Sequence, residues 1–452
     1  MAMNKEKVKE LLHFYCPWWA SGKVPDVLVL DFKRQALRTL FRYLSLNRIL
    51  VIKGPRRTGK TTVIYQMIEK LLSRKTVPPG NILYLSFDDP ELRVDLNEIF
   101  SVYEEILGIS LEKGQEIYCF LDEVQFLENW QFAVKKYFDR KYPVKFIVSG
   151  SSASLIHKDT ESLAGRTVEH VFLPFNFAEY LAYTLKNEKI ENIISGIKKN
   201  FSFSSLPDIA GLLPYKREIS IEFNNYISWG GFPHILEVAD EMLKYKLLRE
   251  DIIEKVIYRD MVEIFGIKKP FVLEKLFLYL AEHSSEILNT SNVSNTLKLS
   301  REYTEKYIDY LKQAYIARTI KKYSASVEKI IRSNEKCFLI DNGLIKIAGG
   351  EVPAGKLVET AVLRHLENRE IYYWRDKEEV GFVIRENKNL FPIEVKYKSN
   401  IEKKDIAGLL KMTKDYKLSS AIVVTKDIFA EKKMDGLRLL YIPAWLFVLL
   451  AD

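Results

Sequence analysis

The pattern Gly-Pro-Arg-Arg-Thr-Gly-Lys-Thr at residues 54–61 constrains the fold more than any other feature of the sequence. It follows an apolar stretch, Arg48–Lys53, that is typical of a buried strand. It precedes a segment, Thr62–Leu72, whose apolar residues recur at helical spacing. A strand, a turn bounded by two glycines and the start of a helix are the context in which this pattern, the Walker A motif, forms a phosphate-binding loop.

Each residue type in the loop suits the binding of a nucleoside triphosphate. The two glycines let backbone N–H groups turn toward the β-phosphate, at the positive end of the following helix. Lys60 can reach the β- and γ-phosphates, and the Thr61 hydroxyl can bind Mg²⁺. A glycine-rich turn that carries Lys-Thr by chance is the alternative. The predicted nucleotide-binding residues are Gly54, Pro55, Arg56, Arg57, Thr58, Gly59, Lys60, Thr61 and Thr62.

Two adjacent acids end a second strand-like stretch, Ile117–Leu121. Asp122 is placed to hold Mg²⁺, and Glu123 is placed to act as the general base that activates the attacking water. The alternative is that Asp122 only caps a helix. The loop and the acidic pair together predict ATP hydrolysis. GTP is disfavoured, because no convincing Asn-Lys-x-Asp pattern for recognition of the base is present.

Serine residues follow another strand-like stretch, Lys145–Ser149. Ser149 and Ser151 could contact the γ-phosphate or the attacking water, although serine after a strand is also ordinary turn chemistry. Strands that alternate with helices predict a parallel sheet covered on both faces, with nucleotide at the carboxyl ends of the strands. With the loop and the acidic pair, they predict the class of P-loop fold in which an extra strand separates the loop strand from the strand before Asp122.

Arg166 precedes the last strand-like stretch of this region, Val168–Leu173. An arginine at this point could neutralise charge on the γ-phosphate within its own chain, or it could enter the site of a neighbouring subunit. A surface ion pair is the alternative. We therefore include Arg166 among the candidate catalytic residues, with both modes of action left open.

Composition excludes several classes of protein. The chain of 452 residues carries 68 basic and 60 acidic residues, a net charge of +8 that permits nucleic-acid binding without arguing for it. Its three cysteines lie too far apart for a disulfide framework or a zinc site. The longest apolar run, Leu439–Ala451, is broken by Pro443 and is shorter than the ~20 residues of a membrane span. We expect this run to form a buried strand and helix in a cytoplasmic protein.

The middle of the chain predicts helices and a second folded segment. Residues 186–225 are polar and poorly periodic, and we interpret 186–269 as a helical lid or connector. Residues 270–323 show three helical patterns followed by a strand, which is typical of a winged helix-turn-helix. Between residues 286 and 323, seven basic residues stand against four acidic ones, and acids interrupt the third helix. DNA binding and a purely structural role therefore remain equally open.

Motifs along nearly the whole chain carry a family resemblance. They are Trp18-Trp19, Gly54–Thr62, Leu121–Gln125, Trp130, Ser149–Ser151, Gly165-Arg166, Leu173–Tyr180, Gly230–Pro233, Tyr258–Asp260 and Asp341–Gly343. The chain resembles the AAA-type P-loop ATPases of prokaryotes that carry a C-terminal, nuclease-like domain of unknown function. The resemblance implies an α/β ATPase core with a parallel sheet, a helical and winged-helix segment, and a restriction-endonuclease-like α/β domain. The predicted boundaries are 1–185, 186–269, 270–350 and 351–452.

The resemblance also implies a metal-dependent nuclease site in the last segment, but the sequence departs from it. Similar chains have Glu-Val-Asp-Phe where this one has Gly381 in place of the aspartate, and glycine offers no side chain to a metal. Glu379 lies on the same strand face but ~7 Å away. A degenerate domain that binds or scaffolds is therefore expected. The candidate residues of the degenerate site are Glu359, Glu379, Glu394 and Lys396.

These features predict Mg²⁺-dependent binding and hydrolysis of ATP, coupled to a conformational switch or to remodelling of nucleic acid or a partner protein. A nucleotide-gated DNA- or protein-binding regulator with little turnover is one alternative, and an ATP-driven nuclease is another. The AAA resemblance makes a homo-oligomer a further expectation, and no membrane partner is expected. The candidate catalytic residues are Lys60, Glu123, Ser149 and Arg166, and the candidate metal ligands are Thr61 and Asp122.

Overall fold

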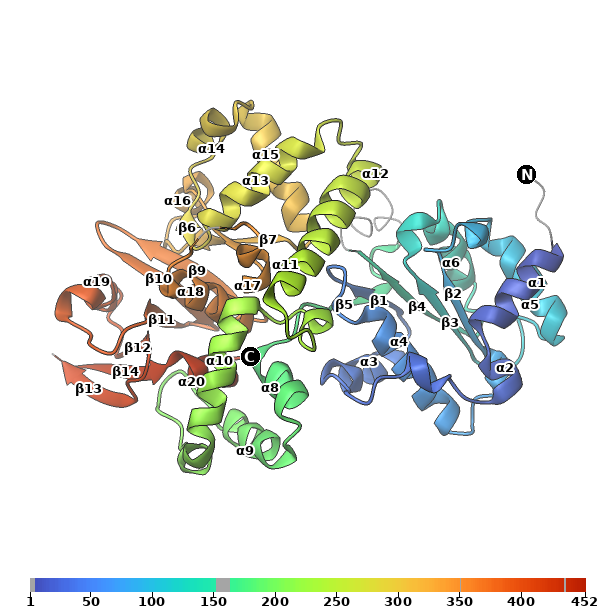
Figure 1. Ribbon diagram of the computed structural model, residues 1–452, viewed down its shortest axis with the longest axis horizontal. Coiled ribbons are helices and arrows are strands. Elements are labelled where there is room, and N and C mark those ends of the chain that lie inside the picture. The colour runs from blue at the N-terminus through green and yellow to red at the C-terminus, as the bar shows by residue number, and fades with distance from the viewer. Residues whose placement is uncertain (1–4, 152–162, 350, 435) are drawn as a thin grey trace. The chain divides into compact units, whose positions relative to one another are not determined.

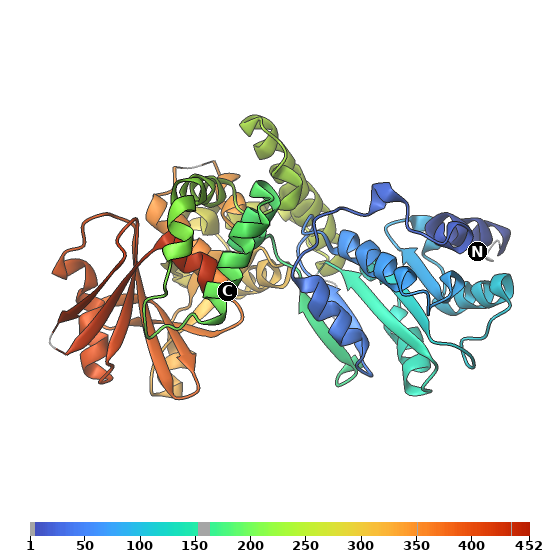
Figure 2. The same cartoon turned by 90° about the horizontal axis from the view of Figure 1, so that it is seen from below.

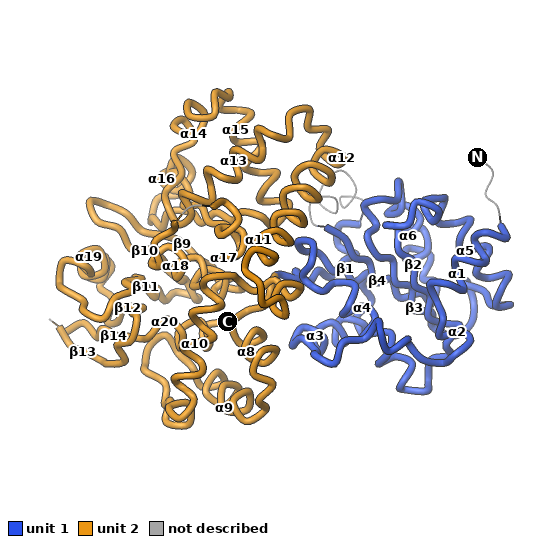
Figure 3. The backbone as a smooth tube through the Cα atoms, viewed as in Figure 1, with its two compact units in different colours: residues 1–173 blue, residues 174–452 orange. Residues whose placement is uncertain are grey.

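The computed structural model, drawn in Figure 1 and turned by 90° in Figure 2, describes residues 5–151, 163–349, 351–434 and 436–452. The chain divides into two compact units, residues 1–173 and 174–452 (Figure 3). Each unit is built on a sheet of its own. Within the described ranges, the helices are all too short or too polar to span a bilayer.

The first unit contains a parallel sheet of five strands. Its strands are β1 (Ile49–Lys53), β2 (Ile82–Ser86), β3 (Ile117–Asp122), β4 (Val144–Gly150) and β5 (Thr167–Val171). They are arranged in the order β2-β3-β4-β1-β5, and each neighbouring pair is parallel. Strand β4 lies between β1 and β3, so the predicted extra strand is confirmed (Figure 1).

Helices lie on both sides of this sheet (Figure 2). The reason is visible in β1, whose five consecutive residues are all buried. Both faces of the strand must therefore be covered by other elements. The helices of the unit are α1 (Lys5–Tyr15), α2 (Trp18–Ser21), α3 (Ala36–Leu44), α4 (Lys60–Ser73), α5 (Leu96–Leu107) and α6 (Trp130–Asp139). Short 3₁₀ turns occur at Asp26–Leu28, Pro79–Asn81, Pro90–Leu92 and Val124–Phe126.

The second unit contains a mixed sheet of nine strands in the order β13-β14-β12-β11-β10-β9-β7-β8-β6. These strands are β6 (Glu286–Ile287), β7 (Ala317–Lys322), β8 (Lys336–Leu339), β9 (Glu370–Arg375), β10 (Glu379–Glu386), β11 (Asn389–Lys396), β12 (Ser420–Thr425), β13 (Ala430–Met434) and β14 (Leu437–Pro443). Strand β7 pairs in parallel with β9 through Lys321 and Tyr372. The strand predicted for the winged-helix segment is thus continuous with the sheet of the C-terminal segment.

Helices occupy most of the rest of this unit. They are α8 (Phe177–Leu185), α9 (Glu188–Lys199), α10 (Lys216–Trp229), α11 (Glu241–Arg249), α12 (Met261–Phe265), α13 (Pro270–Glu282), α14 (Thr290–Leu297), α15 (Arg301–Gln313), α16 (Val327–Arg332), α17 (Asn342–Lys346), α18 (Ala354–His365), α19 (Ala407–Asp415) and α20 (Ala444–Leu450). A π-helix, Glu250–Asp260, joins α11 to α12. Short 3₁₀ turns occur at Ala210–Tyr215, Pro233–Ile235 and Lys403–Ile406.

Several predicted elements are confirmed. Helices α13, α14 and α15 and strand β7 lie where the periodicity of 270–323 predicts them, although winged-helix function stays a prediction. The apolar run after Arg438 forms the end of β14 and the fully buried helix α20, as predicted. The stretch 186–225 is more regular than its sequence indicates. It contains α9, whose first turn is capped by the Asn187 side chain and whose buried face is formed by Ile190 and Ile194.

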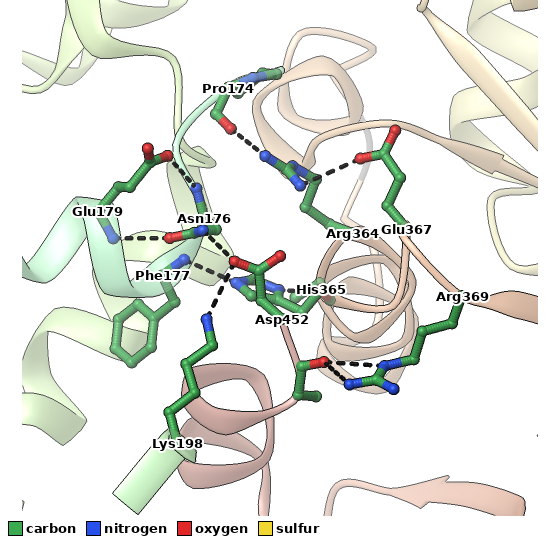
Figure 4. A network of polar contacts seen from close by, with 12 residues as sticks. Pro174, Asn176, Phe177, Glu179, Lys198, Arg364, His365, Glu367, Arg369 and Asp452 are labelled. Atoms are coloured by element: carbon green, nitrogen blue, oxygen red, sulfur yellow. Dashed lines mark hydrogen bonds and ion pairs between the residues drawn. The ribbon is translucent and has the colours of Figure 1, made fainter. Parts of the chain in front are cut away.

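A network of hydrogen bonds and ion pairs links the first residues of the second unit to α18 and to the residues that follow α20 (Figure 4). The Asn176 side-chain amide donates a hydrogen bond to the Asp452 carboxylate, which also lies 3.4 Å from the Lys198 ammonium. The Arg364 guanidinium, on α18, donates to the carbonyl oxygen of Pro174 (2.6 Å). The first residues of the second unit are therefore held to the C-terminal part of the same unit.

His365 is part of the same network and should make stability depend on pH. Its Nε2 accepts from the backbone N–H of Phe177 (2.7 Å), and its Nδ1 donates to the carbonyl of Ala361 (2.7 Å), which requires the neutral ring. Burial lowers the pKa of His365 from 6.5 to about 4, and the Asp452 carboxylate opposes that shift only partly.

The sign of the pH effect follows from proton linkage. Between about pH 6.5 and 4 the unfolded state binds the proton and the folded state does not, so stability falls as pH drops below 6.5. By pH 5 we expect a loss of about 2 kcal/mol, measured from denaturant titrations at pH 7 and pH 5. The variant His365→Gln should lose this component, and the exposed-site control His13→Gln should keep it. An unchanged pH dependence in His365→Gln would contradict the assignment.

Candidate functional site

The loop between β1 and α4 has a backbone conformation that favours glycine at two positions, 54 and 59. Gly54 has a φ of +149°, and a Cβ placed on it would lie 2.1 Å from the carbonyl oxygen of Phe172 at the end of β5. Gly59 has a φ of +92° and immediately precedes α4. Both values lie in the region that side chains disfavour, so the loop can curl tightly beneath the first turn of the helix.

The curled loop is held by its own side chains. The Thr58 hydroxyl donates to the carbonyl oxygen of Pro55 (3.0 Å). The Lys60 ammonium is buried and donates to the carbonyl oxygens of Gly54 (3.0 Å) and Pro55 (2.9 Å). Phosphate oxygens are stronger acceptors than these carbonyls, so Lys60 can exchange its present partners for a nucleotide. Of the remaining loop residues, Arg57 is exposed, and Arg56, Thr61 and Thr62 are half-buried.

Asp122 lies at the centre of the site, at the carboxyl end of β3. Its buried carboxylate accepts hydrogen bonds from the hydroxyls of Thr61 (2.8 Å), Tyr84 (3.1 Å) and Ser149. Burial raises the pKa of Asp122, and the charge of Glu123 raises it further, whereas the hydroxyls of Ser149 and Thr61 lower it. The two predicted metal ligands, Thr61 and Asp122, are thus brought together at the same edge of the sheet.

Glu123 is held in an unusual backbone conformation. Its φ is +54°, a strained value for a residue with a side chain. Its backbone N–H donates to the Ser149 hydroxyl (3.4 Å), and its carboxylate accepts from the Gln125 side-chain amide. Ser149 therefore contacts both members of the acidic pair, and Ser151, the other predicted serine, is buried just beyond it. The Glu123 side chain is half-buried.

Two residues of the site have no signal in the sequence. Tyr84 lies on β2, and its contact with Asp122 depends on β2 being the neighbour of β3. Arg34 lies before α3, and its guanidinium donates to the carbonyls of Thr58 (3.0 Å) and Leu173 (2.9 Å). The same guanidinium lies 4.3 Å from the ring centroid of Phe172. Arg34 thereby connects the phosphate-binding loop to the segment that follows β5.

Arg166 does not lie near the loop. Its carbonyl oxygen accepts from the backbone N–H of Ile49 (2.9 Å), at the start of β1, whereas the loop follows the end of that strand. Strand β1 has 5 residues, or about 16 Å of length. The Arg166 side chain instead pairs with Asp139 at the end of α6 (2.6 Å). The predicted charge clamp within the same chain is therefore wrong, and action in a neighbouring subunit stays a prediction.

The four candidate nuclease residues do come together, in the second unit. Glu359, Glu379, Glu394 and Lys396 line an open pocket of about 610 Å³. A lysine that the sequence did not single out, Lys336, also lines it and bonds to two of these acids. Among the described residues, no group of three or more His, Cys, Asp and Glu side chains is arranged to hold a metal ion.

The helix predicted to enter a DNA groove offers little unpaired charge. On α15, the Arg301 guanidinium pairs with Glu305 (2.8 Å), and the Lys312 ammonium lies 3.5 Å from Asp309. These pairs lower the positive potential that attraction to phosphate requires. They give no support to DNA binding, which stays a prediction for this segment.

Comparisons with known proteins match three parts of the chain to family models. Residues 46–181 match the AAA domain, and residues 220–351 and 354–445 match two domains of unknown function, DUF8612 and DUF4143. An uncharacterized protein of Methanocaldococcus jannaschii, MJ1544, is 30% identical over 388 residues, which cover 83% of this chain and 80% of that protein. An uncharacterized protein of Haemophilus influenzae is 27% identical over 424 residues, which cover 91% of this chain and 97% of that protein.

Solved structures give weaker matches. The Aeropyrum pernix ORC1 protein in complex with DNA is 13% identical, with a TM-score of 0.32, and the match covers 73% of this chain and 95% of that one. The ADP form of the Aeropyrum pernix ORC2 protein is also 13% identical, with a TM-score of 0.32, over 76% of this chain and 96% of that one. These scores are too low to assign a ligand or a partner to this chain.

Proposed function

The chain belongs to the family of the Methanocaldococcus jannaschii protein MJ1544 and carries an AAA-type P-loop fold, and on this premise we propose that it is an Mg²⁺-dependent ATPase. The observation that carries the proposal is the hydrogen bond between the Thr61 hydroxyl and the Asp122 carboxylate (2.8 Å). These two oxygen-bearing side chains come from the first turn of α4 and the end of β3, and the two residues lie 61 positions apart in sequence. They meet beside Lys60, at the carboxyl edge of a parallel sheet.

The donors present suit magnesium, which prefers oxygen ligands. Thr61 and Asp122 would hold the ion, and the bound ion would neutralise charge on the β- and γ-phosphates. Lys60 would neutralise more of that charge, and the backbone N–H groups of the loop would bind the β-phosphate. Glu123 would orient the attacking water and accept its proton, with its backbone fixed by Ser149. Ser149 would in this way align the acidic pair with the γ-phosphate.

We extend the proposal to coupling between the nucleotide and the rest of the chain. The end of β5 contacts the loop at Gly54, and Arg34 binds both the loop and Leu173, the last residue of the first unit. A loop that tightens around phosphate would therefore act on the residue from which the second unit continues.

Phosphate release by the purified full-length chain tests the proposed activity. We expect release that depends on Mg²⁺ and falls by roughly 10²-fold or more in Lys60→Ala, because a preorganised charge on the phosphates is lost. Lys70→Ala is the matched control, since Lys70 lies on the same helix at an exposed position. Wild-type release no greater than that of Lys60→Ala would rule out the enzyme. Tight ATP binding with no release would then favour a nucleotide-gated regulator.

A further inference from the structure

Lys336, the first residue of β8, is a buried cation in the middle of the carboxylates of the second unit. Its side chain is only 3% exposed. Its ammonium lies 2.9 Å from the Glu359 carboxylate on α18 and 2.9 Å from the Glu379 carboxylate on β10. Three different elements therefore converge on one positive charge.

A third carboxylate lies beside this pair. Glu394, on β11, accepts from the backbone N–H of Gly381 (3.0 Å) and from the Lys396 ammonium (2.6 Å). A Cβ placed on Gly381 would lie 3.9 Å from the Lys336 nitrogen and 3.8 Å from the Glu359 carboxylate oxygen. The backbone at position 381 thus faces the same point, and a Cβ there would make ordinary van der Waals contacts without a clash.

The charge balance at this point explains why Lys336 can be buried. Burial alone favours the neutral amine, but the charges of Glu359 and Glu379 and their hydrogen bonds more than offset it, so the pKa of Lys336 is raised. Carboxylates gathered around one buried point need a cation, and oxygen-rich clusters of this kind are where proteins hold Mg²⁺ or Mn²⁺. Here a compact ammonium with three donors supplies the positive charge. A divalent ion could enter only by displacing it.

We propose that the Lys336 ammonium is the resident cation of this pocket and occupies the place in which the same carboxylates would otherwise hold a divalent metal ion. The pocket is then complete without metal, and metal-dependent cleavage of nucleic acid does not occur in it. Gly381 offers no side chain to a metal ion, and Lys336 places a fixed positive charge beside the carboxylates. This inference is independent of the proposed ATPase, whose site lies in the other unit.

Binding of Mn²⁺ to the nucleotide-free full-length chain tests the proposal, with free Mn²⁺ followed by electron paramagnetic resonance. Wild type should show no site in the pocket. Lys336→Ala should gain one, bound at least ~10-fold more tightly than any Mn²⁺ in wild type, because it removes the ammonium that two half-buried carboxylates share. Adding Glu359→Gln should abolish the gained site. Any Mn²⁺ bound at Thr61 and Asp122 contributes equally to wild type and to each variant, because neither residue is changed.

The matched control is Lys356→Ala. Lys356 lines the same pocket and pairs with Glu286, but it does not contact Glu359 or Glu379 through any described bond. It should therefore gain no site. The midpoint of thermal unfolding gives a second readout: Lys336→Ala should unfold at a lower temperature than wild type, and Mn²⁺ should raise that temperature in this variant only.

If Lys336→Ala does not fold, a second variant tests whether the Lys336 ammonium excludes a divalent ion. Gly381→Asp adds a Cβ at ordinary contact distance from its neighbours and a carboxylate while Lys336 remains. We expect this variant to fold and to gain no Mn²⁺ site. Binding of Mn²⁺ by Gly381→Asp with Lys336 in place would overturn the proposal. So would a folded Lys336→Ala that binds no more Mn²⁺ than wild type, or wild-type binding that Glu359→Gln weakens.

Discussion

Replacing Glu123 by glutamine is expected to reduce ATP hydrolysis by roughly 10²- to 10⁴-fold, the usual contribution of a general base. Glutamine cannot accept the proton of the attacking water, yet it has the same shape and can still accept the hydrogen bond from Gln125. Affinity for ATP should change little, because Glu123 does not belong to the loop that binds phosphate. Single-turnover hydrolysis and equilibrium binding of labelled ATP measure the two effects separately.

The control for this variant is Glu128→Gln, which makes the same chemical change at an exposed position five residues further along. It should hydrolyse ATP at the wild-type rate. Two results would contradict the assignment of Glu123 as the general base. One is hydrolysis by Glu123→Gln at the wild-type rate, and the other is a loss of hydrolysis that is explained entirely by lost binding.

Gly54→Ala should disrupt the nucleotide site more than any other single methyl group added to the loop. The new Cβ would lie 2.1 Å from the Phe172 carbonyl oxygen, a backbone atom that cannot rotate away, and the φ of +149° would itself be strained. Overpacking and backbone strain together are worth roughly 2–6 kcal/mol. We expect a lower midpoint of thermal unfolding and an ATP affinity reduced by about 10²-fold, since the loop can relax only by opening.

Gly59→Ala separates the two causes. Its φ is also positive, but no atom lies within 4 Å of its added Cβ, so it carries the backbone strain of roughly 1–3 kcal/mol without the collision. It should therefore be the milder variant in thermal unfolding. Gly54→Ala that unfolds and binds ATP like wild type would show that β5 does not press against the loop as described.

The core of the nucleotide site could be predicted because its chemistry is local in sequence. Residues 54–61 carry both the glycines that the turn needs and the cation that phosphate needs, and Asp122 and Glu123 end a strand whose apolar run is unambiguous. Strands that end in functional residues must meet at one edge of a parallel sheet. That rule alone brings Thr61 to Asp122.

The features that were missed depend on register and neighbours, which no local pattern encodes. Tyr84 reaches Asp122 only because β2 lies beside β3, and Arg34 reaches the loop across 24 residues of sequence. The error for Arg166 has the same cause. The pattern locates it before a strand, but only the pairing of β5 with β1 shows that this is the end of the sheet away from the loop.

Lys336 was missed for a related reason. It lies in the segment assigned to a winged helix, whereas the acids that it pairs with lie in the C-terminal segment. The two segments share a sheet because β7 pairs with β9, a parallel contact between distant stretches of chain. The boundary predicted at residue 350 separates Lys336 from these acids, so the predicted site does not include the cation of the pocket.

A crystal structure of the chain with Mg²⁺ and a non-hydrolysable ATP analogue tests the central claim most directly. We predict the γ-phosphate within hydrogen-bonding distance of the Lys60 ammonium, the metal ion between the Thr61 hydroxyl and the Asp122 carboxylate, and Glu123 facing the γ-phosphate through a water molecule. The analogue bound elsewhere, or a metal ion that Thr61 and Asp122 do not contact, would contradict the account.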